Sequence, residues 1–477
     1  MKKIFIEKNL QYLRVSMVDQ GGELSLFMIE KDDGNPKVGE IYLGVIESMV
    51  PGIESYFVNI GKDRNCILPF KKSHKNLKIG DYIIVEILKE ELNEKCAKVT
   101  SKYSLGGDAI VLTLGTGKIF YSSKIRDINF KKKTKSLIKP QNMDIVYRSK
   151  AEILRENELL KEYGALKEKL ISIAKKGEYS NRKCLLYKSH GILKELLSIL
   201  NFEEKNEIIL NDKEIQSFFQ EYKLDLKDEY KQNLSLSYIE DECLFNKFSI
   251  EDKILELIDN KVLTKSEGNI VIDRTEAMTL IDVNSGREGF NGAIVGKNNI
   301  NYESAEIIPK EIIKRNISGI IIVDFVNTKS EKEKEKIIKI LKHGFKNDRN
   351  KVNIYDFTEL GLVQIVRERR GKSAYEYLIS DYSGKLIRYE KLDFNYLLFY
   401  IRNKLKSLYI ISEEDYIYIE VPSYYELEFT NLKDYISSYL NCKKANIYID
   451  FKEEFHDINI KRIYLNEEKK SMSGMKF

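Results

Sequence analysis

Residues 279–284 alternate so regularly that this part of the chain is restricted to a β-strand. The two alternating sets are Thr279, Ile281 and Val283, and Leu280, Asp282 and Asn284. Because a period of two puts each set on one face of a strand, Asp282 and Asn284 are expected to share a face. The Ser-Gly pair at 285–286 is a turn signal, so both side chains are predicted to lie where the strand ends.

A second carboxylate follows another strand-forming run. Residues 319–325 read Gly-Ile-Ile-Ile-Val-Asp-Phe, which predicts a buried strand with Asp324 near its carboxyl end. Carboxylate and amide oxygens suit a hard cation such as Mg²⁺ better than zinc. The residues alone leave an alternative open, because an Asp at a strand end commonly forms a turn. For Asp324 that alternative is weaker, since a carboxylate among β-branched residues is costly to bury without a partner.

Several ordered blocks resemble the ribonuclease E/G family. Residues 270–277, 281–287 and 319–325 look like its catalytic core, 39–45 and 50–61 like its OB-fold insert, and 361–369 like the segment that closes its catalytic subdomain. The blocks occur in the family's order over roughly residues 1–370. The resemblance therefore favours a site at Asp282 and Asp324 over turn chemistry.

The resemblance implies a multidomain α/β fold. Its parts would be a ribonuclease-H-like subdomain (1–38 with 181–265), an inserted OB-fold RNA-binding domain (39–103), a 5′-sensor-like domain (104–180), a DNase-I-like catalytic subdomain (266–370), a small C-terminal α/β domain (371–466) and a flexible tail (467–477). The short strands punctuated by glycine over 39–103 independently indicate a barrel.

It also implies an activity: Mg²⁺-dependent endonucleolytic cleavage of single-stranded RNA, leaving 5′-phosphate and 3′-hydroxyl ends, in rRNA or mRNA processing or turnover. Asp282 and Asp324 would hold Mg²⁺, with Mn²⁺ as a possible substitute, and Asn284 would orient a ligand or the phosphate. Two alternatives remain: a catalytically impaired family member that only binds RNA, and a structural protein whose Asp residues form turns.

The remaining site residues are carried over from the same resemblance. The candidate RNA contacts are Tyr42, Phe57, Ile67, Lys95, Arg367 and Arg369, and the candidate 5′-phosphate sensors are Arg148 and Ser149. Ile67 stands where the family typically has phenylalanine, and Cys96 replaces a glycine after Lys95. Without the resemblance, Phe57 would be interpreted as barrel core, and the two C-terminal arginines could equally be phosphate contacts or part of a solvated helix face.

The chain lacks the cysteines of the family's zinc link. After Arg370 no cysteine occurs before Cys442, so neither structural zinc nor a zinc-linked dimer is expected, and the oligomeric state stays open. The five scattered cysteines contain no CxxC pair and favour reduced thiols. No signal-peptide core or membrane-length apolar run occurs, and we expect a cytoplasmic protein.

Charge gives only local information. With 79 basic and 74 acidic residues the net charge is +5, so RNA affinity would have to come from patches such as the lysine-rich segment 124–139, which could equally be a solvated loop.

A helix over about 151–176 has apolar residues at Leu159, Leu166 and Ile173, which favours packing on its own domain over a coiled coil. The turn residues 115–117 predict a hairpin between 109–114 and 118–121.

Overall fold

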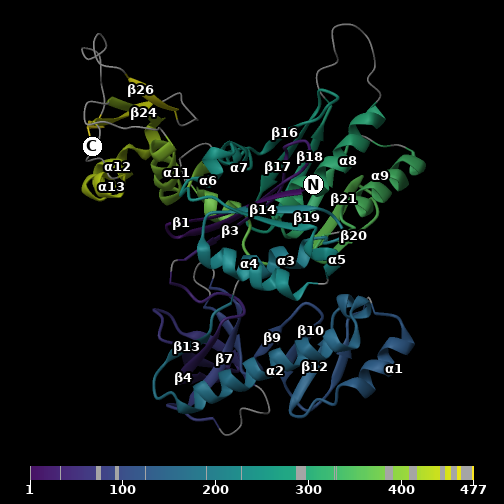
Figure 1. Cartoon of the computed structure of the whole chain (residues 1–477). Helices are drawn as coiled ribbons and strands as arrows, with labels where there is room; N and C mark the ends of the chain where they lie inside the picture. Colours follow the sequence, from purple (N-terminus) through teal and green to yellow (C-terminus); the bar gives the residue numbers. More distant parts are fainter. Residues whose placement is uncertain are drawn as a thin grey trace. The chain divides into compact units, whose positions relative to one another are not determined.

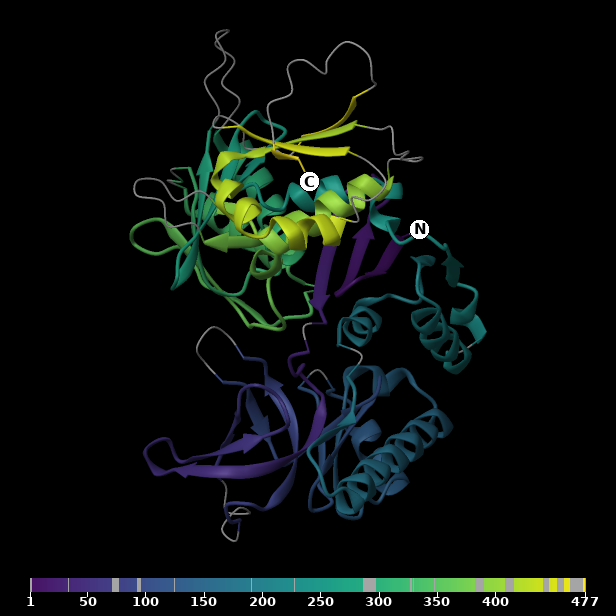
Figure 2. The same cartoon turned by 90° about the vertical axis from the view of Figure 1, so that its left-hand side faces the viewer.

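The computed structural model has two compact units, which are described separately: residues 1–31 with 201–477, and residues 32–200 (Figure 1, Figure 2). It describes residues 2–32, 34–70, 77–91, 96–123, 125–189, 191–226, 228–285, 297–326, 328, 330–346, 348–381, 390–407, 416–440, 446–452, 459–463 and 475–476. Among these residues, no helix combines the length and apolar character needed to cross a membrane. The mixed α/β class expected from the sequence is confirmed.

The first sheet of the unit 32–200 forms a small barrel. Its strands are β4 (Ile41–Val50), β5 (Ser55–Asn59), β6 (Cys66–Pro69), β7 (Tyr82–Lys89), β8 (Lys98–Thr100) and β13 (Cys184–Tyr187), with η1 (Pro51–Ile53) between β4 and β5. The order is β13-β4-β5-β6-β8-β7, and pairing of β4 with β7 closes the barrel. At Gly44 a Cβ would lie 2.6 Å from Val58 Cγ1, so glycine permits the close approach of β4 and β5. The OB-like barrel predicted from the sequence is thus present.

A second sheet in this unit carries the long helix. It orders β11 (Ile119–Tyr121), β12 (Met143–Tyr147), β10 (Ile110–Leu114) and β9 (Ser104–Gly106), with α1 (Ile128–Leu137), η3 (Ser149–Ile153) and α2 (Glu156–Tyr179). The buried side chains of α2 include Leu159, Leu166 and Ile173, which pack in one core with the sheet. Packing on its own domain is therefore confirmed. The lysine-rich segment includes a helix, α1, rather than only a loop.

The predicted hairpin at 115–117 is wrong. β12 lies between β10 and β11, pairing antiparallel with β10 and parallel with β11. The turn is held by Asp144 of β12, whose Oδ1 accepts hydrogen bonds from the backbone N–H groups of Thr116, Gly117 and Lys118 at 2.9, 3.1 and 2.9 Å. A distant strand therefore supplies the anchor for what looks like a local turn.

In the other unit, the amino-terminal strands share a sheet with strands some two hundred residues later. The order is β15 (Leu234–Tyr238), β14 (Asn206–Leu210), β1 (Lys2–Asn9), β2 (Tyr12–Val18) and β3 (Leu24–Lys31). The parallel pairs are β1–β14 and β14–β15. The helices of this unit that lie between β14 and β16 in the sequence are α4 (Lys213–Asp225), α5 (Asp228–Lys231), α6 (Leu244–Lys247) and α7 (Ile250–Leu255), whereas α3 (Gly191–Ile199) belongs to the unit 32–200. β13, which we expected with this subdomain, lies instead in the barrel sheet.

The sheet that holds the candidate site is six-stranded. Its order is β16 (Lys261–Leu263), β17 (Asn269–Arg274), β18 (Met278–Asn284), β19 (Gly319–Asp324), β21 (Leu362–Arg367) and β20 (Val352–Ile354). Helices α8 (Lys297–Lys314) and α9 (Glu331–Gly344) lie on one side of it (Figure 1). Pro309 of α8 packs against α9 where a Cβ on Gly344 would lie 2.6 Å from Pro309 Cγ. Only one face of the sheet is therefore buried by these helices.

The C-terminal part of the chain adds a small sheet and more helices. Its elements are α10 (Tyr375–Leu378), β22 (Ile379–Asp381), β23 (Glu390–Leu392), α11 (Phe394–Ser407), β24 (Tyr416–Pro422), η4 (Ser423–Tyr425), α12 (Glu426–Asn431), α13 (Lys433–Leu440), β25 (Asn446–Lys452), β26 (Asn459–Ile463) and β27 (Met475–Lys476). The sheet order is β26-β24-β25-β27. Of the expected flexible tail, 475–476 pair with β25, and the rest lies outside the described residues.

Candidate active site

Asp282 and Asp324 are neighbours across a parallel strand pair. β18 and β19 run parallel in a register that places Asp282 directly beside Asp324. Both side chains are exposed, whereas Ile281 and Val323, one residue earlier on each strand, are buried against the helices. The alternation that predicted the strands therefore turns both carboxylates to the sheet face opposite α8 and α9.

Asn284 lies on the same face and is bonded to Asp282. Its Nδ2 donates a hydrogen bond of 2.9 Å to Asp282 Oδ2, and the same nitrogen lies 3.5 Å from Oδ1 of Asn269. Asn269 is the cross-strand partner of Asn284 on β17. This contact fixes the orientation of the carboxylate of Asp282 and leaves the amide oxygen of Asn284 as the atom it can offer to a ligand. Sequence reasoning missed Asn269, because its place depends on strand register.

Apolar side chains border the carboxylates on this open face. Two residues back along the strands, Leu280 of β18 faces Ile322 of β19, and before them Met278 faces Ile320. Leu280 is 42% exposed and Ile320 is 45% exposed. Adjacent rows on one face of a strand are about 7 Å apart. The alternation in the sequence already grouped Leu280 with Asp282, whereas its neighbour Ile322 follows only from the strand register.

The oxygen atoms at this edge fit a hard divalent cation. Two carboxylates and one amide oxygen are the ligand types that Mg²⁺ prefers, and Mg²⁺ is commonly held by only one or two carboxylates with water completing its shell. In the described part of the chain, no group of three or more His, Cys, Asp and Glu side chains could hold a metal ion. A cation at Asp282 and Asp324 would therefore stay largely hydrated and open to substrate.

On the barrel, Phe57 and Ile67 form a half-buried pair, whereas Tyr42 is buried. Phe57 of β5 faces Ile67 of β6, and both are half-buried between fully buried neighbours. Ile67 also faces the exposed Lys98 of β8. Phe57 thus lies on the outer face rather than in the barrel core. Lys95 lies outside the described residues.

Tyr42 is part of the barrel core. It is 4% exposed, and its hydroxyl donates a 2.7 Å hydrogen bond to Oε2 of Glu40. Burial and this hydrogen bond raise the pKa of the Tyr42 hydroxyl. The ring therefore has no face that is free to stack on a nucleobase.

The two C-terminal arginines have different environments. Arg367, on β21, is 1% exposed and forms a two-pronged ion pair with Asp348, at 2.7 Å from Nε to Oδ2 and 3.0 Å from Nη2 to Oδ1. Its Nη1 donates to the carbonyl of Ile317 at 2.8 Å. Arg369 is exposed and pairs with Glu376 at 2.7 Å. A structural bond thus accounts for Arg367, which lies on a strand and not on the helix face considered above.

Arg148 and Ser149 lie at the end of β12, in the unit 32–200. Both are exposed, Arg148 as the residue before η3 and Ser149 as its first residue. Nη1 of Arg148 donates a 2.8 Å hydrogen bond to the carbonyl of Gly107. The guanidinium is therefore anchored at one nitrogen while the side chain remains accessible to an anion.

Comparison with known proteins gives one consistent result. A family model described as the ribonuclease E/G family matches residues 104–370. The chain is 27% identical to a ribonuclease E from Nostoc sp., over 79% of this chain but only 57% of that protein. It is 30% identical to a ribonuclease E/G-like protein from Pyropia yezoensis, over 72% of each, and 25% identical to a ribonuclease G from Escherichia coli, over 77% of this chain and 80% of the relative.

Proposed function

We propose that this chain, which belongs to the ribonuclease E/G family, is an endoribonuclease that cleaves single-stranded RNA at Asp282 and Asp324. The observation that carries the proposal is the parallel register of β18 and β19, which sets the two carboxylates side by side on an open sheet face. Two adjacent carboxylates that repel each other gain most from a shared cation.

The residues divide the chemical work as follows. Asp282 and Asp324 would hold Mg²⁺, with Mn²⁺ as a possible substitute. When bound, the cation would offset the negative charge of the phosphate and make a water molecule more acidic. Asn284, through its 2.9 Å bond to Asp282, keeps that carboxylate oriented, and its amide oxygen would orient a ligand that can donate a hydrogen bond. Cleavage would leave 5′-phosphate and 3′-hydroxyl ends.

The neighbouring apolar rows support a single-stranded substrate. Leu280 and Ile322 offer an apolar surface one row from the carboxylates, on which an unpaired nucleobase can pack while its phosphate lies at Asp282 and Asp324. In a duplex the base faces are already stacked. On the barrel, Phe57 would stack on a further base, with Ile67 packing beside it, and Lys98 would contact the backbone.

The 5′ end of the RNA and the cellular role belong to the same proposal. Arg148 would bind a terminal phosphate through its guanidinium, with the hydroxyl of Ser149 beside it. We place the activity in the cytoplasm, in rRNA or mRNA processing or turnover. No zinc link joins protomers in this account, because the chain has no cysteine between Arg370 and Cys442.

The direct experiment is a cleavage assay on an unstructured, 5′-labelled RNA. The proposal predicts internal cuts in Mg²⁺, complete loss of cutting in EDTA, recovery with added Mg²⁺ or Mn²⁺, and products that a 5′-monophosphate-dependent exonuclease can degrade. RNA incubated with Mg²⁺ and no protein is the control. Binding without cutting in any metal would instead support the impaired RNA-binding alternative, and the absence of both would contradict the family assignment of function.

A further inference from the structure

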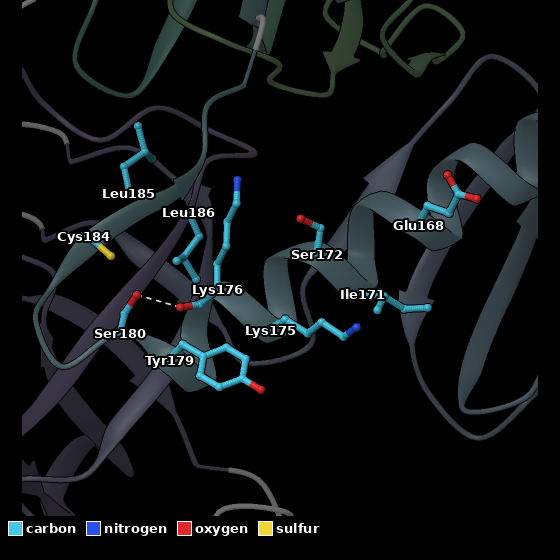
Figure 3. Close-up of a pocket in the computed structure, with 10 residues that line it drawn as sticks. All are labelled: Glu168, Ile171, Ser172, Lys175, Lys176, Tyr179, Ser180, Cys184, Leu185 and Leu186. Atoms are coloured by element: carbon cyan, nitrogen blue, oxygen red, sulfur yellow. Dashed lines mark hydrogen bonds between the residues drawn. The ribbon is translucent and has the colours of Figure 1, made fainter.

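A groove of about 700 Å³ lies between the C-terminal half of α2 and the strand β13. Figure 3 shows its lining side chains, with Ile171, Lys175 and Tyr179 on the helix and Leu185 and Leu186 on the strand. All of them belong to the unit 32–200. None of the residues that line the groove belongs to the site at Asp282 and Asp324.

One wall of the groove is the edge of a sheet. β13 pairs with β4, and within the described residues no second strand pairs with it. Three consecutive residues, Cys184, Leu185 and Leu186, line the groove. The register of β13 against β4 shifts between Leu185 and Tyr187, so the groove contacts three consecutive residues of a short, irregular edge strand. Such an edge presents backbone N–H and C=O groups that can bond another strand.

The opposite wall is apolar with a cationic end. On the helix Ile171 is 38% exposed and Tyr179 84%, and Leu185 on the strand wall is 43% exposed, so each leaves apolar surface uncovered. Lys175 and Lys176 lie near the helix C-terminus, and among the described residues neither has an ion-pair partner. Glu168 lines the groove toward the other end. The groove is therefore apolar along its length, positive at one end and negative at the other.

We propose that this groove binds an extended peptide segment of a partner protein, which adds a strand to the free edge of β13. Apolar side chains of the peptide would pack on Ile171 and Leu185, and acidic residues at one end would face Lys175 and Lys176. A strand edge offers alternating donors and acceptors, which match a peptide backbone, and the aliphatic lining suits its side chains. The phosphates of an RNA backbone can accept hydrogen bonds from the lysines. RNA lacks, however, the regularly alternating N–H and C=O groups that pair with a strand edge.

Peptide selection on the full chain tests the proposal. Short random peptides displayed on phage are panned against the protein, and an enriched peptide is synthesised for titration. We expect apolar sequences with acidic residues at one end. Leu185→Glu and the double variant Lys175→Glu/Lys176→Glu should each weaken binding at least about tenfold. Lys169→Glu is the matched control, an exposed lysine of the same helix that does not line the groove, and it should bind like wild type.

A second readout separates strand addition from simple adhesion. Bound peptide should slow hydrogen exchange of the amides at 184–187, and N-methylation of alternate peptide bonds should weaken binding at least about tenfold. Circular dichroism verifies that the variants fold. Failure to enrich any peptide, or binding that the groove variants leave unchanged, overturns the proposal. The proposal is also overturned if no peptide binds and the groove variants instead lose binding to single-stranded RNA, which would assign the groove to RNA. Loss of self-association in the variants, again with no peptide bound, would assign the groove to a second copy of the chain.

Discussion

At the scale of single residues, Arg367 shows why a sequence match does not determine a role. Both of its bonds to Asp348 are buried, with the two side chains 0% exposed. Replacing Arg367 with alanine leaves Asp348 as an unpaired buried carboxylate, so we expect a loss of about 3–5 kcal/mol in the free energy of unfolding. Urea denaturation measures it.

Arg369→Ala is the matched control, because its ion pair with Glu376 is exposed and such pairs contribute about 0–1 kcal/mol. If Arg367→Ala unfolded like wild type but bound single-stranded RNA more weakly, Arg367 would be a phosphate contact after all.

The site residues differ in how far the sequence could predict them. A period of two places Asp282 and Asn284 on one face, and this local pattern is confirmed by the strand β18. That Asp324 is the exact neighbour of Asp282 required the register of two strands separated by α8. The burial of Tyr42 could not be predicted in this way. A tyrosine in a barrel strand has the same local pattern whether it faces the core or the solvent, and Tyr42 faces the core.

At the scale of elements, Asp144 fixes the turn that links β10 to β11. Burial alone would raise the pKa of Asp144, but hydrogen bonds from the backbone N–H groups of Lys118 and Thr116 outweigh it, so the pKa is lowered from 3.8. The carboxylate therefore stabilises the fold above the ordinary Asp pKa, and this contribution is lost as the pH falls through the lower folded-state value.

We expect Asp144→Asn to destabilise the unit 32–200 by about 1 kcal/mol at neutral pH, since a neutral amide accepts weaker bonds and the site is largely solvated. Denaturant unfolding of both proteins should show the difference shrinking as the pH is lowered below about 4. A difference that stays constant, or grows, on acidification would contradict the role of the charge.

The outer face of the barrel gives a second element-scale prediction. Phe57→Ala removes the aromatic ring from the pair with Ile67, and one base–aromatic stack contributes about 1–3 kcal/mol. Fluorescence anisotropy with an unstructured RNA should therefore show weaker binding by about fivefold or more. Ile67→Phe, which supplies the ring that the family typically has there, should tighten binding. Unchanged affinity in both variants would remove this face from the RNA path.

The incorrect prediction of a hairpin between β10 and β11 shows a limit of local sequence patterns. Two strand-like runs joined by Gly115-Thr116-Gly117 satisfy every local rule for a hairpin. In the structure β12 lies between the two strands, because this pairing buries Ile145 and Tyr147 in the core with α2. The turn signal was correct, while the pairing depended on a strand more than twenty residues away.

At the scale of the whole molecule, a buried polar network joins distant parts of the unit 1–31 with 201–477. Arg14 of β2 forms ion pairs with Glu7 of β1 and Glu251 of α7. The hydroxyl of Tyr396 on α11 accepts a 2.8 Å bond from Arg14 Nη1 and donates one of 2.8 Å to Glu251 Oε1. All four side chains are buried, so α11 is fixed to the amino-terminal sheet by these bonds.

Tyr396→Phe removes both bonds and leaves the ring in place, so it should lower the free energy of unfolding by about 1–3 kcal/mol. Chemical denaturation followed by circular dichroism measures the change. Tyr355→Phe, which changes a tyrosine that is 51% exposed in the same unit, is the comparison, and an equal effect in the two variants would mean that the network has no special role.

The organisation of the whole chain was accessible from sequence only through the family resemblance. Pairing of β1 with β14 joins residues about two hundred positions apart, and no local pattern encodes that parallel register. The net charge of +5 did not identify RNA as a substrate either, since the candidate contacts are local. Composition bounded the size and class of the molecule, and the order of the motifs predicted a division into domains.

The central claim is that Asp282 and Asp324 form the cutting site, and one comparison tests it most directly. Cleavage of an unstructured RNA in Mg²⁺ is measured for wild type, Asp282→Asn and Asp324→Asn, together with the RNA dissociation constant of each protein. Each change removes a charged ligand and keeps the shape, so we predict cleavage rates lower by about a hundredfold or more and dissociation constants within about twofold of wild type. Variants that cut RNA at the wild-type rate would contradict the claim.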